Sequence, residues 1–291
     1  MAAASSVGSR SRTPYLLLLP GMAWLAVFFV IPLVSLLMQS VQTPLPGGLA
    51  GQFEQTFRFA NFVDTLSRPE FLGALGRSFF YALLATIAAL LIAYPLAYAI
   101  ALRAGKAKPV FLILVVAPFF VSFVLRTVAW RQILGAEGPV VSTLQALHLV
   151  PANFSIYPSS FAVIAGLTYN FLPFMTLPIY ASLDRMDTRL IEAAQDLYSS
   201  NWTAFRKVTL PISMPGVVAG TLLTFIPASG DYINAQLLGN ANTTMVGNVV
   251  DARFLINSDY PTASVLSFTL MAIILAMVFV YVRRAGTEEL V

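Results

Sequence analysis

Few residues in this chain could do chemistry, and their types exclude most kinds of active site. The chain has 291 residues, a single histidine (His148) and no cysteine. Zinc and haem sites are normally built from histidine and cysteine, and His148 has no nearby candidate serine–aspartate partner for nucleophilic catalysis. The sequence also lacks a G-x-x-x-x-G-K-[ST] phosphate loop. We therefore expect no catalysis, no ATP binding and no resident metal or cofactor in this chain.

Two charged residues interrupt or end apolar stretches and are candidates for a gate or a solute path. An arginine inside a membrane span costs roughly 2.5–3.5 kcal/mol on insertion scales, so Arg126 should face protein or water. Arg126 could pair with an acidic residue such as Asp231 or with carbonyl groups at a helix end. Alternatively, its long side chain could reach the lipid headgroups on the outer side. Asp231 is either a contact for a cation or a hydrated helix end. The aromatic candidates for the same path are Trp130, Tyr169 and Tyr232, which alternatively anchor the membrane interface.

Six apolar stretches are long enough to hold these residues in membrane-spanning helices. Charged residues make up 10% of the chain, hydrophobic residues 58%, and the mean hydropathy is +0.78. This composition excludes a soluble enzyme, a disordered chain and a disulfide scaffold. A spanning helix needs about 20 mostly apolar residues. The stretches are 15–38, 78–102, 109–134, 161–180, 208–230 and 260–282, the first read as a retained helix rather than a signal peptide. They predict an all-α polytopic membrane protein with six transmembrane helices.

The basic residues predict that both chain termini are cytoplasmic. With six spans the termini share one side, which holds eleven of the 17 Lys and Arg residues and leaves six for the other side. Cytoplasmic loops carry the excess of such residues. We expect a cytoplasmic tail over 1–14, a transmembrane domain over 15–283 and a second tail over 284–291. The basic residues orient helices and contact lipid headgroups, and they require no nucleic acid partner.

Polar and small residues inside the spans have packing roles as their simplest explanation. We expect Asn170, Thr168 and Ser229 to form hydrogen bonds between helices. Gly216 and Gly220 are four residues apart, a spacing that favours close helix packing.

The cytoplasmic segment 184–210 is long, helix-like and dense in charges of both signs. Asp187 or Thr188 can cap a first helix, and Asn201 can cap a second short one. Pro211 sits where a new helix would begin on re-entering the membrane. Aromatic residues near arginine make good interface anchors. The pattern leaves two possibilities, a docking surface for a protein or an amphipathic linker on the bilayer.

Within this segment, Glu192-Ala193-Ala194 followed by Leu210-Pro211 resembles the EAA loop of binding-protein-dependent ABC importer permeases. The resemblance implies the MetI-like fold of type I importers and an ATPase-coupling role for this loop. The implied coupling residues are Glu192, Ala193, Ala194, Asp196, Tyr198, Trp202, Phe205, Arg206, Leu210 and Pro211. Tyr198 departs from the pattern, because the family usually has glycine there. Tyrosine is disfavoured in a left-handed turn, so we expect that turn to be remodelled or shifted onto residues 199–201.

The segments 118–130 and 227–239, with 245–248 after them, resemble the PotB/PotH-like, polyamine branch of this family. The resemblance implies a permease subunit of an ATP-driven spermidine/putrescine importer in a bacterial cytoplasmic membrane. It implies a homologous second permease (PotC-like), two copies of an ATP-binding subunit (PotA-like) that hold ATP-Mg, and an extracytoplasmic substrate-binding protein (PotD-like). Related permeases carry iron(III), molybdate or sugars on the same scaffold, so these solutes stay open. A stand-alone secondary carrier is the more distant alternative.

Overall fold

The structure is a computed structural model that describes residues 13–151 and 153–285. The expected tails lie almost entirely outside these residues, which begin at Thr13 and end at Ala285. The described chain is almost entirely helical, and its only sheet is a two-stranded hairpin. Five helices are long and apolar enough to cross a membrane, and the number is six if two helical segments bent by 96° to each other are counted as one span. Each of the six predicted stretches corresponds to one of these helices or to the bent pair.

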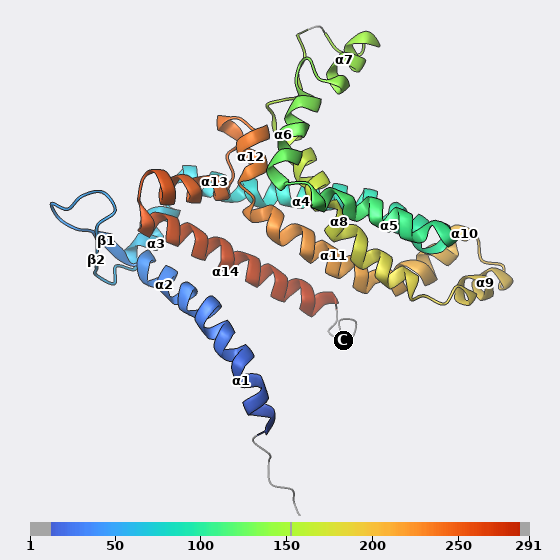
Figure 1. The fold of residues 1–291 in the computed structure, drawn as a ribbon, viewed down its shortest axis with the longest axis horizontal. Coiled ribbons are helices and arrows are strands. Elements are labelled where there is room, and N and C mark those ends of the chain that lie inside the picture. Colours follow the sequence, from blue (N-terminus) through green and yellow to red (C-terminus); the bar gives the residue numbers. More distant parts are fainter. Residues whose placement is uncertain (1–12, 152, 286–291) are drawn as a thin grey trace, which may run out of the picture.

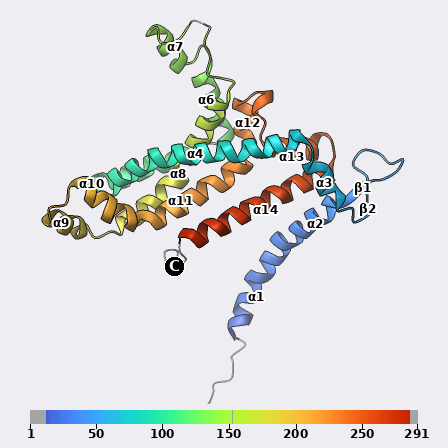
Figure 2. The same ribbon diagram turned by 180° about the vertical axis from the view of Figure 1, so that it is seen from behind.

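Three helices form the centre of the molecule: α4 (Pro69–Leu102), α8 (Ser160–Asp184) and α11 (Leu210–Gly230). They run side by side along the long axis in both ribbon views (Figures 1 and 2). Alanines repeat every four residues on the buried face of α4, at 85, 89, 93 and 97. Small residues at this spacing let helices approach closely, and the alanine face packs against Met175, Ile179 and Leu183 of α8.

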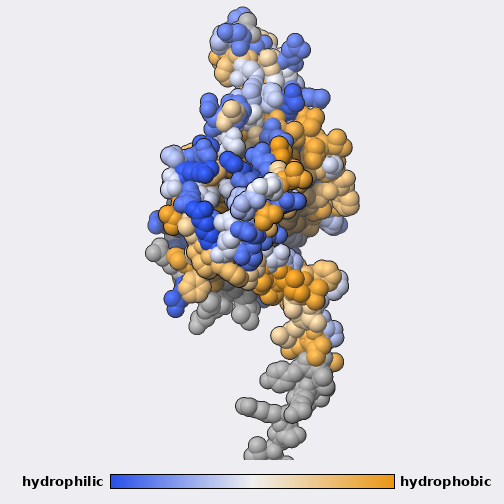
Figure 3. All heavy atoms as spheres, turned by 90° about the vertical axis from the view of Figure 1, so that its left-hand side faces the viewer, coloured by the Kyte–Doolittle hydropathy of each residue, from blue (hydrophilic) through white to orange (hydrophobic). Residues whose placement is uncertain are grey.

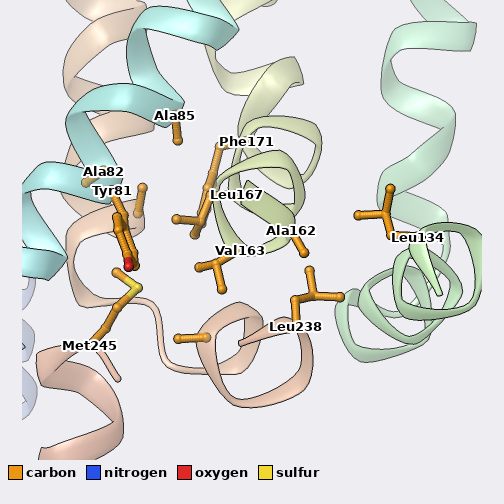
Figure 4. Packing of buried hydrophobic residues seen from close by; sticks show 12 residues of the cluster. Tyr81, Ala82, Ala85, Leu134, Ala162, Val163, Leu167, Phe171, Leu238 and Met245 are labelled. Carbon is orange, nitrogen blue, oxygen red and sulfur yellow. The ribbon is translucent and has the colours of Figure 1, made fainter. Parts of the chain in front are cut away.

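The core continues beyond this interface with larger side chains. Figure 4 shows Tyr81, Ala82 and Ala85 of α4 turned toward Val163, Leu167 and Phe171 of α8. Leu238 and Met245, from segments that follow α11, close one end of the same cluster. The end of the bundle beyond α11 is thus tied into the main core.

The two glycines on α11 pack directly on the backbone of α8. A Cβ on Gly216 would lie 2.5 Å from the carbonyl oxygen of Pro178, and one on Gly220 would lie 2.9 Å from that of Met175. Real Cβ atoms essentially never approach closer than 3.0 Å. The prediction that Gly216 and Gly220 support close helix packing is confirmed.

The third span is broken shortly after Pro118. It starts with η2 (Gly105–Ala107), α5 (Lys108–Val116) and the 3-10 segment η3 (Ala117–Phe120), and α6 (Phe123–Leu134) and α7 (Pro139–Ala146) follow. The break falls at Val121 and Ser122, whose ψ angles are 138° and 136°. Two extended residues cannot continue a helix, so α6 and α7 turn away from the bundle (Figure 1). The predicted stretch 109–134 is therefore helical in two parts, one on either side of this break.

The first and last spans lie outside the central bundle. The first comprises α1 (Thr13–Leu25), the π-helical η1 (Ala26–Val30) and α2 (Ile31–Ser40), and the last is α14 (Tyr260–Ala285). None of the first span's most apolar window is buried, and 11% of that of the last span is. α2 packs on α14, while α1 points away from the bundle (Figures 1 and 2).

One end of the bundle carries several short elements. They are the hairpin of β1 (Gln42–Pro44) and β2 (Phe53–Gln55), then α3 (Ala60–Leu66), α12 (Ile233–Leu238), η5 (Ala241–Thr243), α13 (Val246–Asp251) and the π-helical η6 (Ala252–Ile256). The hairpin is antiparallel, with Thr43 opposite Glu54. Figure 3 looks at this end and shows hydrophilic residues gathered on it beside a hydrophobic flank. At the opposite end lie α9 (Arg189–Asp196), α10 (Asn201–Ala204) and the π-helical η4 (Phe205–Thr209).

Candidate functional site

The charged loop 184–210 forms two short helices, α9 and α10, at the far end of the bundle (Figure 1). The Asp187 carboxylate accepts the backbone N–H of Arg189 at 3.0 Å and so supports the start of α9. Ser200, not Asn201, caps α10: its hydroxyl accepts the N–H of Thr203 at 3.2 Å. The prediction for Asn201 is wrong, because its side-chain oxygen instead accepts a hydrogen bond from Gln195 at 3.0 Å. That bond ties α9 to α10.

The turn after α9 keeps the left-handed geometry that glycine usually supplies, although the residue is tyrosine. Tyr198 has φ +58°. Its N–H donates to the carbonyl of Gln195 at 2.9 Å, and the N–H of Ser199 donates to that of Ala194 at 3.2 Å. These two bonds form a complete Schellman motif. The expected remodelling of the turn is therefore wrong, and Tyr198 bears a backbone cost of about 1–2 kcal/mol.

Phe205 holds the loop against the spans. Its ring packs edge-on to Tyr94 and Tyr98 of α4, with centroids 5.7 and 6.3 Å apart, and stacks on Trp202 at 5.4 Å. Trp202 itself is 68% exposed. The aromatic pair thus has one ring against the bundle and one ring facing outward.

Most of the other residues of the EAA-like pattern face away from the bundle. Glu192, Ala193, Asp196, Arg206 and Pro211 are exposed, while Ala194 and Leu210 are half-buried. The loop therefore presents both charges and apolar groups to whatever lies beyond this end.

The loop and the fifth span are one helix. Helical structure runs from Asn201 to Gly230 through η4. The sequence predicted a new helix beginning at Pro211, but Pro211 lies inside this continuous helical structure. Proline has no N–H to donate to the preceding turn, and the π-helical segment ends two residues before Pro211. The position of α10 is therefore coupled to that of α11 through continuous helical structure.

Toward the other end of the bundle, three polar side chains meet in the core; we call them the polar junction. They are Thr127 of α6, Asn170 of α8 and Asn234 of α12, and all are buried. The amide nitrogen of Asn170 donates to the Thr127 hydroxyl at 3.2 Å and to the Asn234 side-chain oxygen at 3.0 Å. Asn170 thus joins three helices, as predicted. Thr168 and Ser229 instead bond to carbonyls one turn back in their own helices, so the prediction for them is wrong.

Arg126 and Asp231 lie beside the polar junction but do not pair with each other. The ion pairs within residues 13–151 and 153–285 do not include them. Asp231 instead accepts the backbone N–H of Asn234 at 2.8 Å and so supports the start of α12. The Arg126 guanidinium lies over the rings of Phe119 and Phe123, 5.7 and 5.5 Å from their centroids. Its Nε and Nη1 atoms are buried and have no hydrogen-bond partner among the described residues.

Of the three aromatic path candidates, two come together. Trp130 of α6 packs edge-on to Tyr169 of α8 with centroids 5.4 Å apart. Tyr232 is 40% exposed and lies apart, beside an apolar cavity of about 850 Å³ between α11, α13, α14 and the first span. Sequence reasoning did not identify Thr127 and Asn234. Each is a polar residue close in sequence to a candidate, and that proximity is the signal that could have found them.

A polytopic helical bundle with a charged helical hairpin at one end is the architecture of an importer permease. Residues 104–285 match the family model of the binding-protein-dependent transport system inner membrane component, and the chain belongs to this family. It is therefore a multi-pass protein of the bacterial inner membrane and a permease subunit rather than an enzyme.

Curated relatives extend this match over nearly the whole chain. The spermidine/putrescine transport system permease protein PotB of Haemophilus influenzae is 36% identical, covering 90% of each chain. PotB of Escherichia coli is 32% identical over 90% of this chain and 94% of its own. The inner membrane ABC transporter permease protein YdcU of Escherichia coli is 31% identical over 94% of this chain and 90% of its own.

Solved structures agree on the fold. A chain of a bacterial ABC transporter involved in the import of the acidic polysaccharide alginate superposes with a TM-score of 0.73 at 18% identity, covering 95% of this chain and 96% of that one. A chain of the MetNI methionine ABC transporter gives a TM-score of 0.51 at 18% identity, covering 74% of this chain and 93% of its own. The MetI-like fold predicted from the sequence is confirmed.

Proposed function

We propose that this chain is a permease subunit of an ATP-driven importer for polyamines of the spermidine and putrescine type. The observation that carries the proposal is the 36% identity to the Haemophilus influenzae PotB protein over 90% of both chains. A likeness of this extent includes the residues that we propose for the solute path and for coupling.

The charged loop is the proposed contact with a cytoplasmic ATPase. Its exposed carboxylates, Glu192 and Asp196, and its exposed ring, Trp202, face outward, while Phe205 fixes the loop to the spans. Motion imposed on α10 reaches α11 without a break in the helix. The loop can thus pass a movement of the ATPase to the far end of the fifth span, which Asp231 follows directly.

In this proposal both termini and the loop 184–210 lie on the cytoplasmic side. A homologous PotC-like permease would complete the membrane path, two PotA-like subunits would bind and hydrolyse ATP, and a PotD-like protein would deliver the solute at the end with the hairpin and α3. The hydrophilic residues gathered at that end suit contact with water and with a soluble protein (Figure 3).

The path itself is proposed to pass Trp130, Tyr169, Tyr232 and Asp231. Aromatic faces attract cations, and a carboxylate at the end of the fifth span suits a polycation. Arg126 would repel a polycation, so we place it beside the path as a gate residue rather than in it. Its burial under Phe119 and Phe123 suits that place.

The test is transport by the reconstituted four-component complex in liposomes. With the loaded binding protein outside and ATP inside, labelled spermidine or putrescine should accumulate. Excess molybdate, iron(III) or maltose should not compete, whereas the unlabelled polyamine should. Accumulation of one of those other solutes in place of polyamines would refute the substrate assignment, and accumulation without ATP would refute the importer mechanism.

A further inference from the structure

The strongest unassigned feature of the chain is the exposed tyrosine at the corner between α9 and α10. Tyr198 is fully exposed and lies next to Leu197, which is 81% exposed. Among the described residues, no aromatic ring packs on Tyr198 and no hydrogen bond reaches its hydroxyl. Within the described part of the chain, this large side chain is therefore held in a left-handed conformation without a ring contact or a hydrogen bond to offset its cost.

A strained residue that persists without an internal partner points to a function outside the subunit. Glycine at this position would form the same Schellman turn without steric cost. The ring is therefore not needed for the turn, and its contribution must come from a contact that the isolated subunit does not contain.

The surroundings of Tyr198 identify the kind of partner. Leu197, Tyr198 and Trp202 place three large exposed side chains within six residues, and clustered exposed apolar groups mark interaction surfaces. α9 lies beyond the last residues of the spans, at the tip of the long axis in both ribbon views (Figures 1 and 2). The exposed carboxylates of Glu192 and Asp196 alternate with exposed basic residues such as Arg189, so the loop is not the one-signed basic surface that anionic lipid headgroups attract. The features together favour a soluble protein over the membrane surface.

We propose that Tyr198 is an anchor that inserts into a pocket of the partner ATPase and gives this permease a preference for its own ATPase. The pocket would have apolar walls for the ring and a hydrogen-bond partner for the hydroxyl at its rim, the usual environment of a buried interface tyrosine. The inference rests on the proposed function, because it requires an ATPase that docks on this loop.

Four substitutions at Tyr198 separate the ring from the turn. Y198F keeps the ring and the strain, Y198A keeps the strain without the ring, and Y198N and Y198G remove the ring and relieve the strain. The permease pair would be placed in lipid nanodiscs, and the affinity of the purified partner ATPase measured by titration. We expect Y198F to bind within about threefold of the parent, and the other three to bind on the order of tenfold more weakly.

Phe57 supplies a matched control at the opposite end. It is also an exposed aromatic residue with positive φ, +52°, and it lies between β2 and α3. F57G and F57A should leave the affinity for the ATPase unchanged. Equal weakening by these variants would show a general loss of stability and would overturn the assignment to Tyr198.

Other results would overturn the inference in distinct ways. If Y198G and Y198N bind as well as the parent while Y198A does not, the residue matters only through the turn. If all four variants bind normally, no anchor exists. Failure of the unaltered permease pair to bind any ATPase would refute the proposed function itself. Normal binding of the ATPase without polyamine transport would refute only the assignment of the solute and would not affect the proposed role of Tyr198.

Discussion

Replacing Gly216 by alanine is the sharpest test of how the bundle is packed. The new Cβ would stand 2.5 Å from the Pro178 carbonyl oxygen and 2.5 Å from the Ser182 hydroxyl. Ordinary contact begins at 3.4 Å, so α11 and α8 must separate by about 0.9 Å. One of the opposing atoms is backbone, which no rotamer change can move away. We expect a loss near the upper part of the range of about 1–3 kcal/mol that overpacking costs.

The glycines of this chain provide a graded series for the same measurement. G220A meets the Met175 carbonyl at 2.9 Å and should cost less than G216A, while G76A meets nothing within 4 Å on the exposed side of α4. The assay is the thermal midpoint of the purified transporter in detergent, which should fall by several degrees for G216A, less for G220A and not at all for G76A. Equal midpoints for G216A and G76A would refute the reasoning that α8 and α11 touch through their backbones.

Three further outcomes follow from the other contacts. F205A removes the ring that packs on Tyr94 and should cost about 3 kcal/mol of local packing energy. We expect transport to fall and ATP hydrolysis to become independent of the loaded binding protein, with a milder effect in F205L. ATP hydrolysis that still depends on the loaded binding protein in F205A would contradict the role of Phe205 in holding the loop. N170L removes both hydrogen bonds that Asn170 donates and leaves the Asn234 side-chain oxygen with only the 3.5 Å bond from the Thr127 hydroxyl. It should therefore lower the thermal midpoint by more than T168V, which removes a bond within one helix. Equal effects of the two variants would contradict a joint between helices. R126Q should give a normal yield of complex, because two of the guanidinium nitrogens have no hydrogen-bond partner to lose among the described residues. It should reduce uptake, and R126K should be intermediate. Full uptake by R126Q would show that Arg126 is not a gate residue.

The long apolar spans could be predicted from the sequence because lipid imposes a length and a composition on any helix that crosses it. The break at Val121–Ser122 could be predicted only in part: Pro118, three residues before Val121, indicates a kink in the apolar stretch 109–134, but the valine and the serine at the break are ordinary span residues. The bend depends on the packing of α6 on α8 and α12, which are distant in sequence.

The loop shows a different limit. The positions of α9 and α10 followed from their spacing, yet the conformation of Tyr198 did not. In an isolated turn, tyrosine avoids the left-handed region of backbone conformation. In the folded chain, the hydrogen bonds of the Schellman motif and the Gln195–Asn201 bond outweigh that preference. A conflict between local energy and observed geometry is therefore informative about function.

The uninterrupted helix from Asn201 to Gly230 has a mechanical consequence. At 1.5 Å per residue its thirty residues form a lever about 45 Å long. A tilt of about 5° at the end that carries Trp202 displaces the other end by about 4 Å, more than the length of a hydrogen bond. That distal end is followed at once by Asp231, which supports α12, and α12 holds Asn234 of the polar junction. A small rotation of the helix at the end that carries Trp202 is thus large enough at the Asp231 end to break or form hydrogen bonds there.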